Sequence, residues 1–240
     1  MKIDRLYSPN FYKLKRSRKL VKTIVIHYTG MQSERESLIK LCNLQSKVSA
    51  HYLIKKNGHI YRLVEDNQIA WHAGKSCWGK YKNLNKSSIG IELTNKGHQF
   101  GYTHFPKKQL SSLTWLCTKL IKKYKIKKKN IVGHSDVAPL RKKDPGEKFP
   151  WEKLALKNIG IWHDYKIDFL KKFRKIKISK NKKLKFIKNI NNIGYCFFSK
   201  NKADFNKTVK AFQRHHRKKL INGLIDKECT IIAENLSKNL

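Results

Sequence analysis

The sequence predicts an α/β fold over residues 1–156 and a small all-α unit over residues 179–240. Short apolar runs in the first part, bounded by glycine or turn residues, are typical of buried strands. Apolar residues at helical spacing occur between these runs and again near the end of the chain. The clearest strand candidates are residues 23–26, 88–93 and 130–133.

The first predicted helix begins after Ser33. Ser33 and Glu36 have the spacing of a capping box, in which two side chains satisfy the free backbone amides of a helix start. Leu38, Leu41 and Cys42 then recur on one face. This pattern predicts an amphipathic helix packed on the core.

A second, longer helix is predicted from Pro106, because proline is favoured in the first turn of a helix. The strand and helix motifs stop after Trp151. Residues 157–178 are Lys-rich and amphipathic, and we expect them to link two units. The apolar stripe of the second helix is Leu110, Leu113, Cys117, Leu120, Ile121 and Tyr124.

The last part of the chain, residues 179–240, is expected to form a three-helix bundle. Three apolar faces are separated by turn residues, and Asp204 and Asp226 are expected to be helix N-caps. The apolar faces comprise Ile187, Ile190, Ile193 and Tyr195, then Phe205, Val209 and Phe212, then Ile231, Ile232 and Leu236.

Two histidines and an aspartate form a candidate metal site. His27 and His134 each end an apolar run, and a polar residue at the end of a strand points into a cleft at the sheet edge. Asp144 follows in a loop. Two imidazoles and a carboxylate are ligands that a catalytic zinc takes, with a fourth position open for water. The spacing differs from HExxH and from zinc fingers, and a single histidine is more often an ordinary core or surface residue.

Six motifs that surround these residues resemble one family. They are residues 23–29, 48–54, 69–74, 88–93, 132–139 and 142–146. In this order they resemble the zinc-dependent N-acetylmuramoyl-L-alanine amidases, a family that includes the amidase-type phage lysozymes and the peptidoglycan recognition proteins.

The resemblance extends over about residues 20 to 155 and implies a mixed sheet flanked by helices. It also implies one zinc ion held by His27, His134 and Asp144. The reaction it implies is cleavage of the amide bond between N-acetylmuramic acid, or its 1,6-anhydro form, and the L-alanine of the stem peptide.

Glu92 is the candidate general base. Zinc lowers the pKa of bound water to about 7 and polarises a carbonyl, but a protein group must still move the protons. Strand alternation places Glu92 and Gly90 on one face, where the glycine is expected to leave space for substrate. The alternative is a solvated glutamate on an exposed strand, and the family resemblance favours the base.

Lys142 is the candidate oxyanion stabiliser. It stands two residues before Asp144, so both side chains project the same way from an extended loop. An ammonium there stabilises negative charge on the attacked carbonyl. Most loop lysines are only solvated charges, but Lys142 falls on the catalytic lysine of the family.

The second motif departs from the phage lysozymes. These enzymes carry a tyrosine before its histidine, where this chain has Ala50. The departure assigns proton transfer to Glu92, as in the bacterial members that use glutamate. We expect His51, flanked by apolar residues on a predicted strand, to be structural.

Substrate contacts are expected from Trp71, His72 and Ala73, which resemble the substrate-cleft motif of the family. Packing is the alternative for this Trp-His pair. Tyr28 and Asn95 border the site and are further candidates for substrate binding.

The net charge of +39 favours polyanionic partners, including nucleic acid, acidic lipid and the carboxylate-rich cell wall. A general drift toward Lys, Ile and Asn is the simpler explanation for most of the lysines, which are not grouped on one motif. No recognition helix, zinc-finger spacing or RNA-binding aromatic signature occurs. We therefore expect peptidoglycan or muropeptide fragments as partners, and no specific nucleic acid.

The five cysteines are odd in number, widely spread and without a CxxC pair, which predicts free thiols. The N-terminal segment lacks the apolar stretch of a signal peptide, and no run has transmembrane length. These features predict a cytoplasmic protein. An intact-wall substrate would instead require the periplasm or cell envelope, reached by another export route.

Residues 208–214 and 222–226 resemble the three-helix peptidoglycan-binding domain. We therefore expect a catalytic domain at 1–156, a linker at 157–178 and a binding domain at 179–240. The rival function is a recognition protein that binds muropeptides without cleaving them. Such a protein would normally lack a metal ligand, whereas this chain has all three and Glu92.

Overall fold

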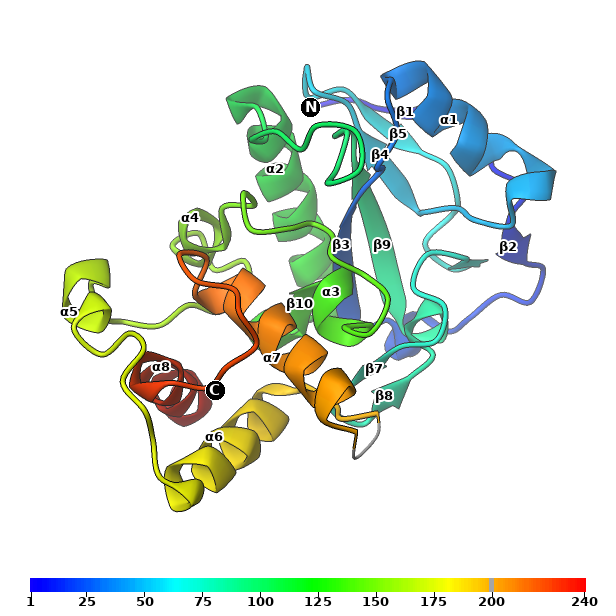
Figure 1. Ribbon diagram of the computed structural model, residues 1–240. Helices are drawn as coiled ribbons and strands as arrows, with labels where there is room; N and C mark the ends of the chain where they lie inside the picture. Colours follow the sequence, from blue (N-terminus) through cyan, green and yellow to red (C-terminus); the bar gives the residue numbers. More distant parts are fainter. Residues whose placement is uncertain (199–200) are drawn as a thin grey trace.

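A mixed six-stranded sheet forms the centre of residues 1–156, the part predicted to be catalytic and called the catalytic part here (Figure 1). The computed structural model describes residues 1–198 and 201–240. All neighbouring strands in the sheet are parallel except β4 and β5, which are antiparallel. In spatial order the strands are β1 (Ile3–Arg5), β5 (Ile60–Arg62), β4 (Tyr52–Ile54), β9 (Ser88–Leu93), β3 (Thr23–Tyr28) and β10 (Ile131–Gly133).

Two small antiparallel pairs flank the sheet. One is β2 (Phe11–Tyr12) with β6 (Ile69–Ala70), and the other is β7 (Cys77–Trp78) with β8 (Tyr81–Lys82). The described α-helices are α1 (Glu34–Cys42), α2 (Lys107–Tyr124), α3 (His134–Val137), α4 (Trp151–Ala155), α5 (Ile167–Lys171), α6 (Lys180–Ile193), α7 (Lys202–His216) and α8 (Lys227–Lys238). The described 3₁₀ helices are η1 (Arg18–Leu20), η2 (Leu44–Ser46), η3 (Leu84–Lys86) and η4 (Lys128–Asn130).

Alternation along the strands gives the sheet two different faces. Ile24 and Ile26 of β3 belong to the same hydrophobic cluster as Leu113 and Leu120 of α2. Val25, which points the other way, belongs to a cluster that contains the C-terminal helices. His27 lies on the same face as Val25, so the candidate metal site lies on the side of the sheet away from α2.

Both helices predicted in the catalytic part are confirmed. Ser33 caps α1, and its Oγ accepts a hydrogen bond from the Glu36 amide. The Glu36 carboxylate accepts a hydrogen bond from the amide of Gln32. In the standard capping box this second bond comes from the amide of the N-cap residue, which here is Ser33. Pro106 is the N-cap of α2.

The C-terminal helices α6, α7 and α8 form the expected small all-α unit, and most of its predicted apolar positions are buried. Asp226 caps α8 as predicted, through a hydrogen bond from the Cys229 amide. The prediction for Asp204 is wrong, because α7 begins earlier, at Lys202. Its N-cap is Asn201, whose side chain accepts a hydrogen bond from the Ala203 amide.

The C-terminal helices do not form a separate core. One hydrophobic cluster combines Val25, Val132 and Val137 of the catalytic part with residues of all three C-terminal helices. The expected linker also contributes, since it contains α5 and its Leu170 is buried in this cluster. The C-terminal members are Phe186, Ile190, Ile193, Tyr195, Val209, Ala211, Phe212, Cys229, Ile232, Ala233 and Leu236.

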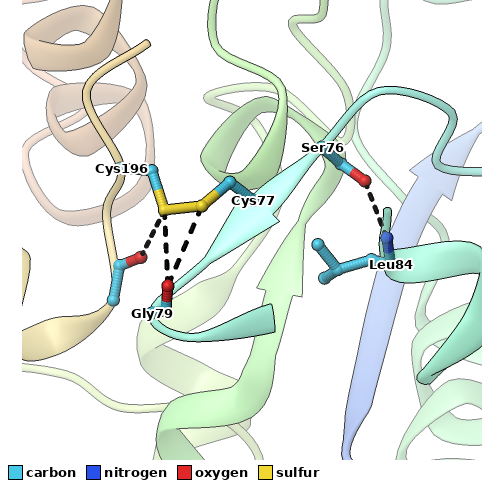
Figure 2. The surroundings of a disulfide bond; sticks show 6 residues. Ser76, Cys77, Gly79, Leu84 and Cys196 are labelled. Carbon is cyan, nitrogen blue, oxygen red and sulfur yellow. Dashed lines mark hydrogen bonds between the residues drawn. A yellow bond between two sulfur atoms is a disulfide. The ribbon is translucent and has the colours of Figure 1, made fainter. Parts of the chain in front are cut away.

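A disulfide bond between Cys77 and Cys196 joins the two parts (Figure 2). Cys77 lies on β7, and Cys196 lies in the segment that follows α6. The prediction of free thiols is therefore wrong for this pair. Their sequence separation of 119 residues gives no local pattern, and only the fold brings them together. The remaining cysteines, Cys42, Cys117 and Cys229, are free.

Within residues 1–198 and 201–240, no helix has both the length and the apolar character needed to cross a lipid bilayer.

Candidate metal centre and active site

His27, His134 and Asp144 meet at one edge of the sheet. The parallel strands β3 and β10 end side by side, so His27 at the end of β3 and His134 directly after β10 lie close together. Their Nδ1 atoms are 2.9 Å apart, and Asp144 Oδ2 lies 3.0 Å from the first and 3.1 Å from the second. All three side chains are buried. The structure therefore brings the predicted ligand set together.

A chain of hydrogen bonds fixes the tautomer of His27. Ser88 Oγ donates to the Leu84 carbonyl, which only accepts, so Ser88 must accept from His72 Nε2 at 3.1 Å. His72 Nδ1 is then unprotonated and accepts from His27 Nε2, also at 3.1 Å. The remaining nitrogen, His27 Nδ1, directs a lone pair at the site. Burial, followed by the proximity of His134, lowers the pKa of His27 to about 4, so the ring is neutral at pH 7.

The tautomer of His134 is fixed in a similar way. Its Nε2 lies 3.2 Å from the Ala73 carbonyl oxygen, which only accepts hydrogen bonds. The proton of the neutral ring is therefore on Nε2, and Nδ1 directs its lone pair at Asp144 and His27. The backbone carbonyl of Ala73 thus orients a candidate ligand.

The site fits a small cation. Two nitrogen lone pairs and a carboxylate oxygen converge at separations of 2.9 to 3.1 Å, with no hydrogen atom between them. These three electron-rich atoms repel one another unless a positive charge lies among them. Bonds of about 2.0–2.1 Å in a tetrahedral site place ligand atoms about 3.3–3.4 Å apart, within a few tenths of the separations here. His27, His134 and Asp144 are thus a candidate metal-binding cluster.

Glu92 faces this cluster from the neighbouring strand. It pairs with His27 in the register of β3 and β9, and both residues line a cavity of about 410 Å³. Its Oε2 is buried and has no hydrogen-bond partner among the described residues. Burial, with a smaller contribution from the charge of Asp144, raises the pKa of Glu92 to about 8.

Comparison with known proteins identifies the family. Residues 16–147 match the model of the N-acetylmuramoyl-L-alanine amidase family. The chain is 37% identical over 234 residues to the N-acetylmuramoyl-L-alanine amidase AmiD of Escherichia coli strain K12, covering 90% of this chain and 82% of that protein. The chain belongs to the N-acetylmuramoyl-L-alanine amidase family.

Other relatives and solved structures are consistent with this assignment. The 1,6-anhydro-N-acetylmuramyl-L-alanine amidase AmpD of Haemophilus influenzae is 44% identical over 110 residues, 45% of this chain and 58% of that protein. The structure of Escherichia coli AmiD with the substrate anhydro-N-acetylmuramic acid-L-Ala-D-γ-Glu-L-Lys has a TM-score of 0.81 and 34% identity, covering 95% of this chain and 92% of that chain. Pseudomonas aeruginosa AmpDh3 in complex with an anhydromuramic pentapeptide has a TM-score of 0.80 and 29% identity, covering 96% of each chain. Both structures cover the C-terminal helices as well as the catalytic part.

Besides Glu92, four of the residues predicted for the site line the same cavity: Lys142, Trp71, His72 and Tyr28. Asn95 is not among its lining residues. The Asn95 side chain donates to the Thr103 carbonyl and accepts from the Gly97 amide, so it shapes the following loop.

Gly90 has a different role from the one predicted. A Cβ atom at this position would lie 2.4 Å from the His72 ring. The space that the glycine leaves is therefore filled by His72 and not by substrate. Because His72 holds His27, Gly90 and Ser88 of β9 both serve the metal-binding cluster.

His51 is structural, as predicted, although it precedes β4 rather than lying within it. Its Nδ1 accepts from the Gly90 amide at 3.0 Å, and its Nε2 lies 2.9 Å from Arg16 Nη2. Burial, followed by the charge of Arg16, lowers its pKa to about 3. The ring is therefore neutral and carries its proton on Nε2, which donates to the Gln68 carbonyl oxygen at 3.2 Å.

Sequence reasoning missed the residues that orient the ligands. Ser88, the Ala73 carbonyl and the Leu84 carbonyl act through hydrogen bonds between segments that are distant in sequence. The alternation of β9 was the available signal, since it places Ser88 on the same face as Glu92.

Proposed function

We propose that this amidase holds one zinc ion with His27, His134 and Asp144 and hydrolyses the bond between N-acetylmuramic acid and L-alanine. The convergence of three lone-pair atoms at about 3 Å from one another carries this proposal. Nitrogen and oxygen ligands in this combination suit zinc. When bound, zinc polarises the scissile carbonyl and lowers the pKa of a coordinated water toward neutrality.

Glu92 is the proposed general base. Its carboxylate lines the same cavity as the ligands, and its Oε2 has no competing hydrogen bond from the described residues. A pKa of about 8, raised by burial, lies close to neutral pH, where a carboxyl group can both accept and return a proton. Glu92 therefore takes a proton from the attacking water and delivers it to the departing amine of L-alanine.

Lys142 is the proposed oxyanion stabiliser. It lies on the loop that carries Asp144 and lines the same cavity as Glu92. Its ammonium group supplies positive charge where the attacked carbonyl oxygen becomes negative.

Substrate binding is proposed to involve aromatic and basic groups at the cavity mouth. Trp71 and Tyr28 offer rings against which a sugar or stem peptide can pack. Lys40, Arg141 and Lys143 add positive charge, which suits the carboxylates of a stem peptide. AmiD and AmpDh3 have been solved with anhydromuramic peptides, which supports 1,6-anhydro fragments as substrates of this enzyme.

The cell envelope is the proposed compartment, in place of the cytoplasm that the N-terminal sequence predicts. Disulfides persist mainly in oxidising compartments, and Cys77 is bonded to Cys196.

We further propose that residues 179–240 form a peptidoglycan-binding domain, consistent with the wall as a substrate. Pelleting of the protein with purified sacculi in high salt tests this binding while screening non-specific attraction.

One experiment tests the catalytic proposal. Purified protein is analysed for zinc and incubated with anhydro-muropeptides and with sacculi, and the products are identified by mass spectrometry. His134→Ala should lose both zinc and activity, whereas Glu92→Gln should keep zinc and lose turnover by about 10²-fold or more. A His134→Ala protein with full zinc content and full rate would exclude the proposed site. Binding of muropeptides by the unaltered, zinc-loaded protein without release of peptide would favour the recognition-protein alternative.

A further inference from the structure

The buried carboxylate of Asp136 connects the metal-binding cluster with the C-terminal helices. Asp136 lies in α3, two residues after His134, and is 1% exposed. Its Oδ2 accepts from the Gly133 amide at 2.7 Å, which fixes the turn into α3. Two further contacts reach it from the C-terminal part: Tyr195 Oη donates to Oδ1 at 2.8 Å, and His215 Nδ1 lies 2.7 Å from Oδ2.

Both C-terminal partners are held in place by their own packing. The His215 ring stacks on Trp151 at a centroid distance of 3.9 Å and an interplanar angle of 16°. The Tyr195 ring meets Trp78 edge to face at 4.9 Å. Tyr195 also precedes Cys196, whose disulfide to Cys77 fixes the backbone beside it (Figure 2). Asp136 is thus bound by two side chains with little freedom to move.

The same C-terminal part supports the other side of the His134 ring. His134 Nε2 contacts the Ala73 carbonyl, and Ala73 belongs to the hydrophobic cluster that includes Tyr195 and Phe212. The disulfide is attached at Cys77, four residues after Ala73. Two segments orient His134: α3 and the stretch from Ala73 to β7. Residues of the C-terminal part therefore hold both of them.

We propose that the C-terminal part positions the proposed metal ligand His134, with Tyr195, in the segment after α6, and His215 of α7 acting as positioning residues through Asp136. Metal affinity then depends on residues that are far from the site in sequence and never touch the ion. This inference rests on the proposed zinc site. It gives the C-terminal part a role in building the active site, in addition to any role in wall binding.

The test measures zinc affinity rather than activity, in the full-length protein with its disulfide intact. Tyr195→Phe removes one hydroxyl group and keeps the ring against Trp78. His215→Phe keeps a ring on Trp151 and removes the contact with Asp136. Zinc dissociation constants are measured by competition with a chelating dye, under conditions where circular dichroism and melting curves show every variant to be folded.

The matched control is Tyr52→Phe. Tyr52 Oη donates to the buried carboxylate of Asp66 at 2.6 Å, so this variant loses the same kind of bond. Tyr52 lies in the hydrophobic cluster that contains α2, on the opposite face of the sheet. The control therefore lowers stability without altering the support of His134.

We expect Tyr195→Phe and His215→Phe to weaken zinc binding by about 10-fold or more, the range seen when a group that orients a ligand is removed. Tyr52→Phe should bind zinc like the unaltered protein. Unchanged affinity in both C-terminal variants, or an equal loss in Tyr52→Phe, would overturn the inference. Failure of the unaltered protein to bind zinc would instead refute the proposed metal site.

Discussion

Replacing Glu92 with glutamine should make the metal-free protein more stable at alkaline pH. Burial raises the pKa of Glu92 from its ordinary value of 4.5 to about 8. Below pH 4.5 the carboxyl is protonated in both the folded and the unfolded protein, so it does not change the free energy of unfolding. As pH rises toward 8 the unfolded chain releases this proton while the folded protein retains it, and the folded state loses stability.

The size of this effect follows from the pKa difference. Each pKa unit corresponds to about 1.4 kcal/mol, so the rise of Glu92 from 4.5 to about 8 gives an upper figure of about 5 kcal/mol. Because Glu92 lines a cavity, water that enters it would relieve part of this burial penalty, and we expect about 3 to 5 kcal/mol. Glu92→Gln cannot ionise and should escape this loss, so its advantage over the unaltered protein should grow from near zero at pH 4.5 to this value at pH 9.

The assay is urea unfolding in the presence of a chelator, at several pH values between 4.5 and 9. The difference in free energy of unfolding between the variant and the unaltered protein is plotted against pH, which cancels the titration of other groups. Glu65→Gln, at an exposed glutamate, is the control and should show no such trend. A constant difference for Glu92→Gln across this pH range would refute the reasoning, because it would mean that Glu92 is ionised throughout.

Three further predictions concern the disulfide and the two sides of the active site. Replacing Cys77 and Cys196 together with serine opens a loop with a sequence separation of 119 residues and should lower the free energy of unfolding, measured in urea, by about 2–4 kcal/mol. An unchanged unfolding midpoint would contradict this. Ser88→Ala removes the acceptor that fixes the His72 proton and should weaken zinc binding in a dye competition by about 10-fold. Equal affinity would mean that the hydrogen-bond chain does not set the tautomer. Lys142→Ala should retain zinc but lower kcat by about 10²-fold, and a wild-type kcat would exclude its oxyanion role.

The sequence by itself was sufficient for the architecture of the sheet and for the candidate metal-binding cluster. The apolar runs that end in His27 and His134 predicted buried strands, because such runs have few other stable environments. Neighbouring parallel strands end at the same edge of a sheet. The histidines at the ends of β3 and β10 therefore lie close together once these strands pair. The capping residues Ser33 and Pro106 located the two helices because helix starts depend on local backbone geometry.

Polar contacts between distant segments could not be predicted. The chain from His27 through His72 to Ser88 depends on ring orientations that packing sets, and Gly90 is required there because a side chain would collide with His72. The side-chain contacts of Asn95 could not be predicted for the same reason. Its amide satisfies nearby backbone groups of a loop whose course the sequence does not specify.

The relation between the two parts was decided by tertiary structure alone. Helical spacing predicted the apolar faces of the C-terminal helices, but spacing does not tell which surface a face covers. Those faces cover Val25 and Val132, beside the candidate metal-binding cluster, rather than only one another. The disulfide between Cys77 and Cys196 follows from the same docking, since a bond between residues so far apart in sequence requires the fold to bring their Cα atoms to 5.9 Å.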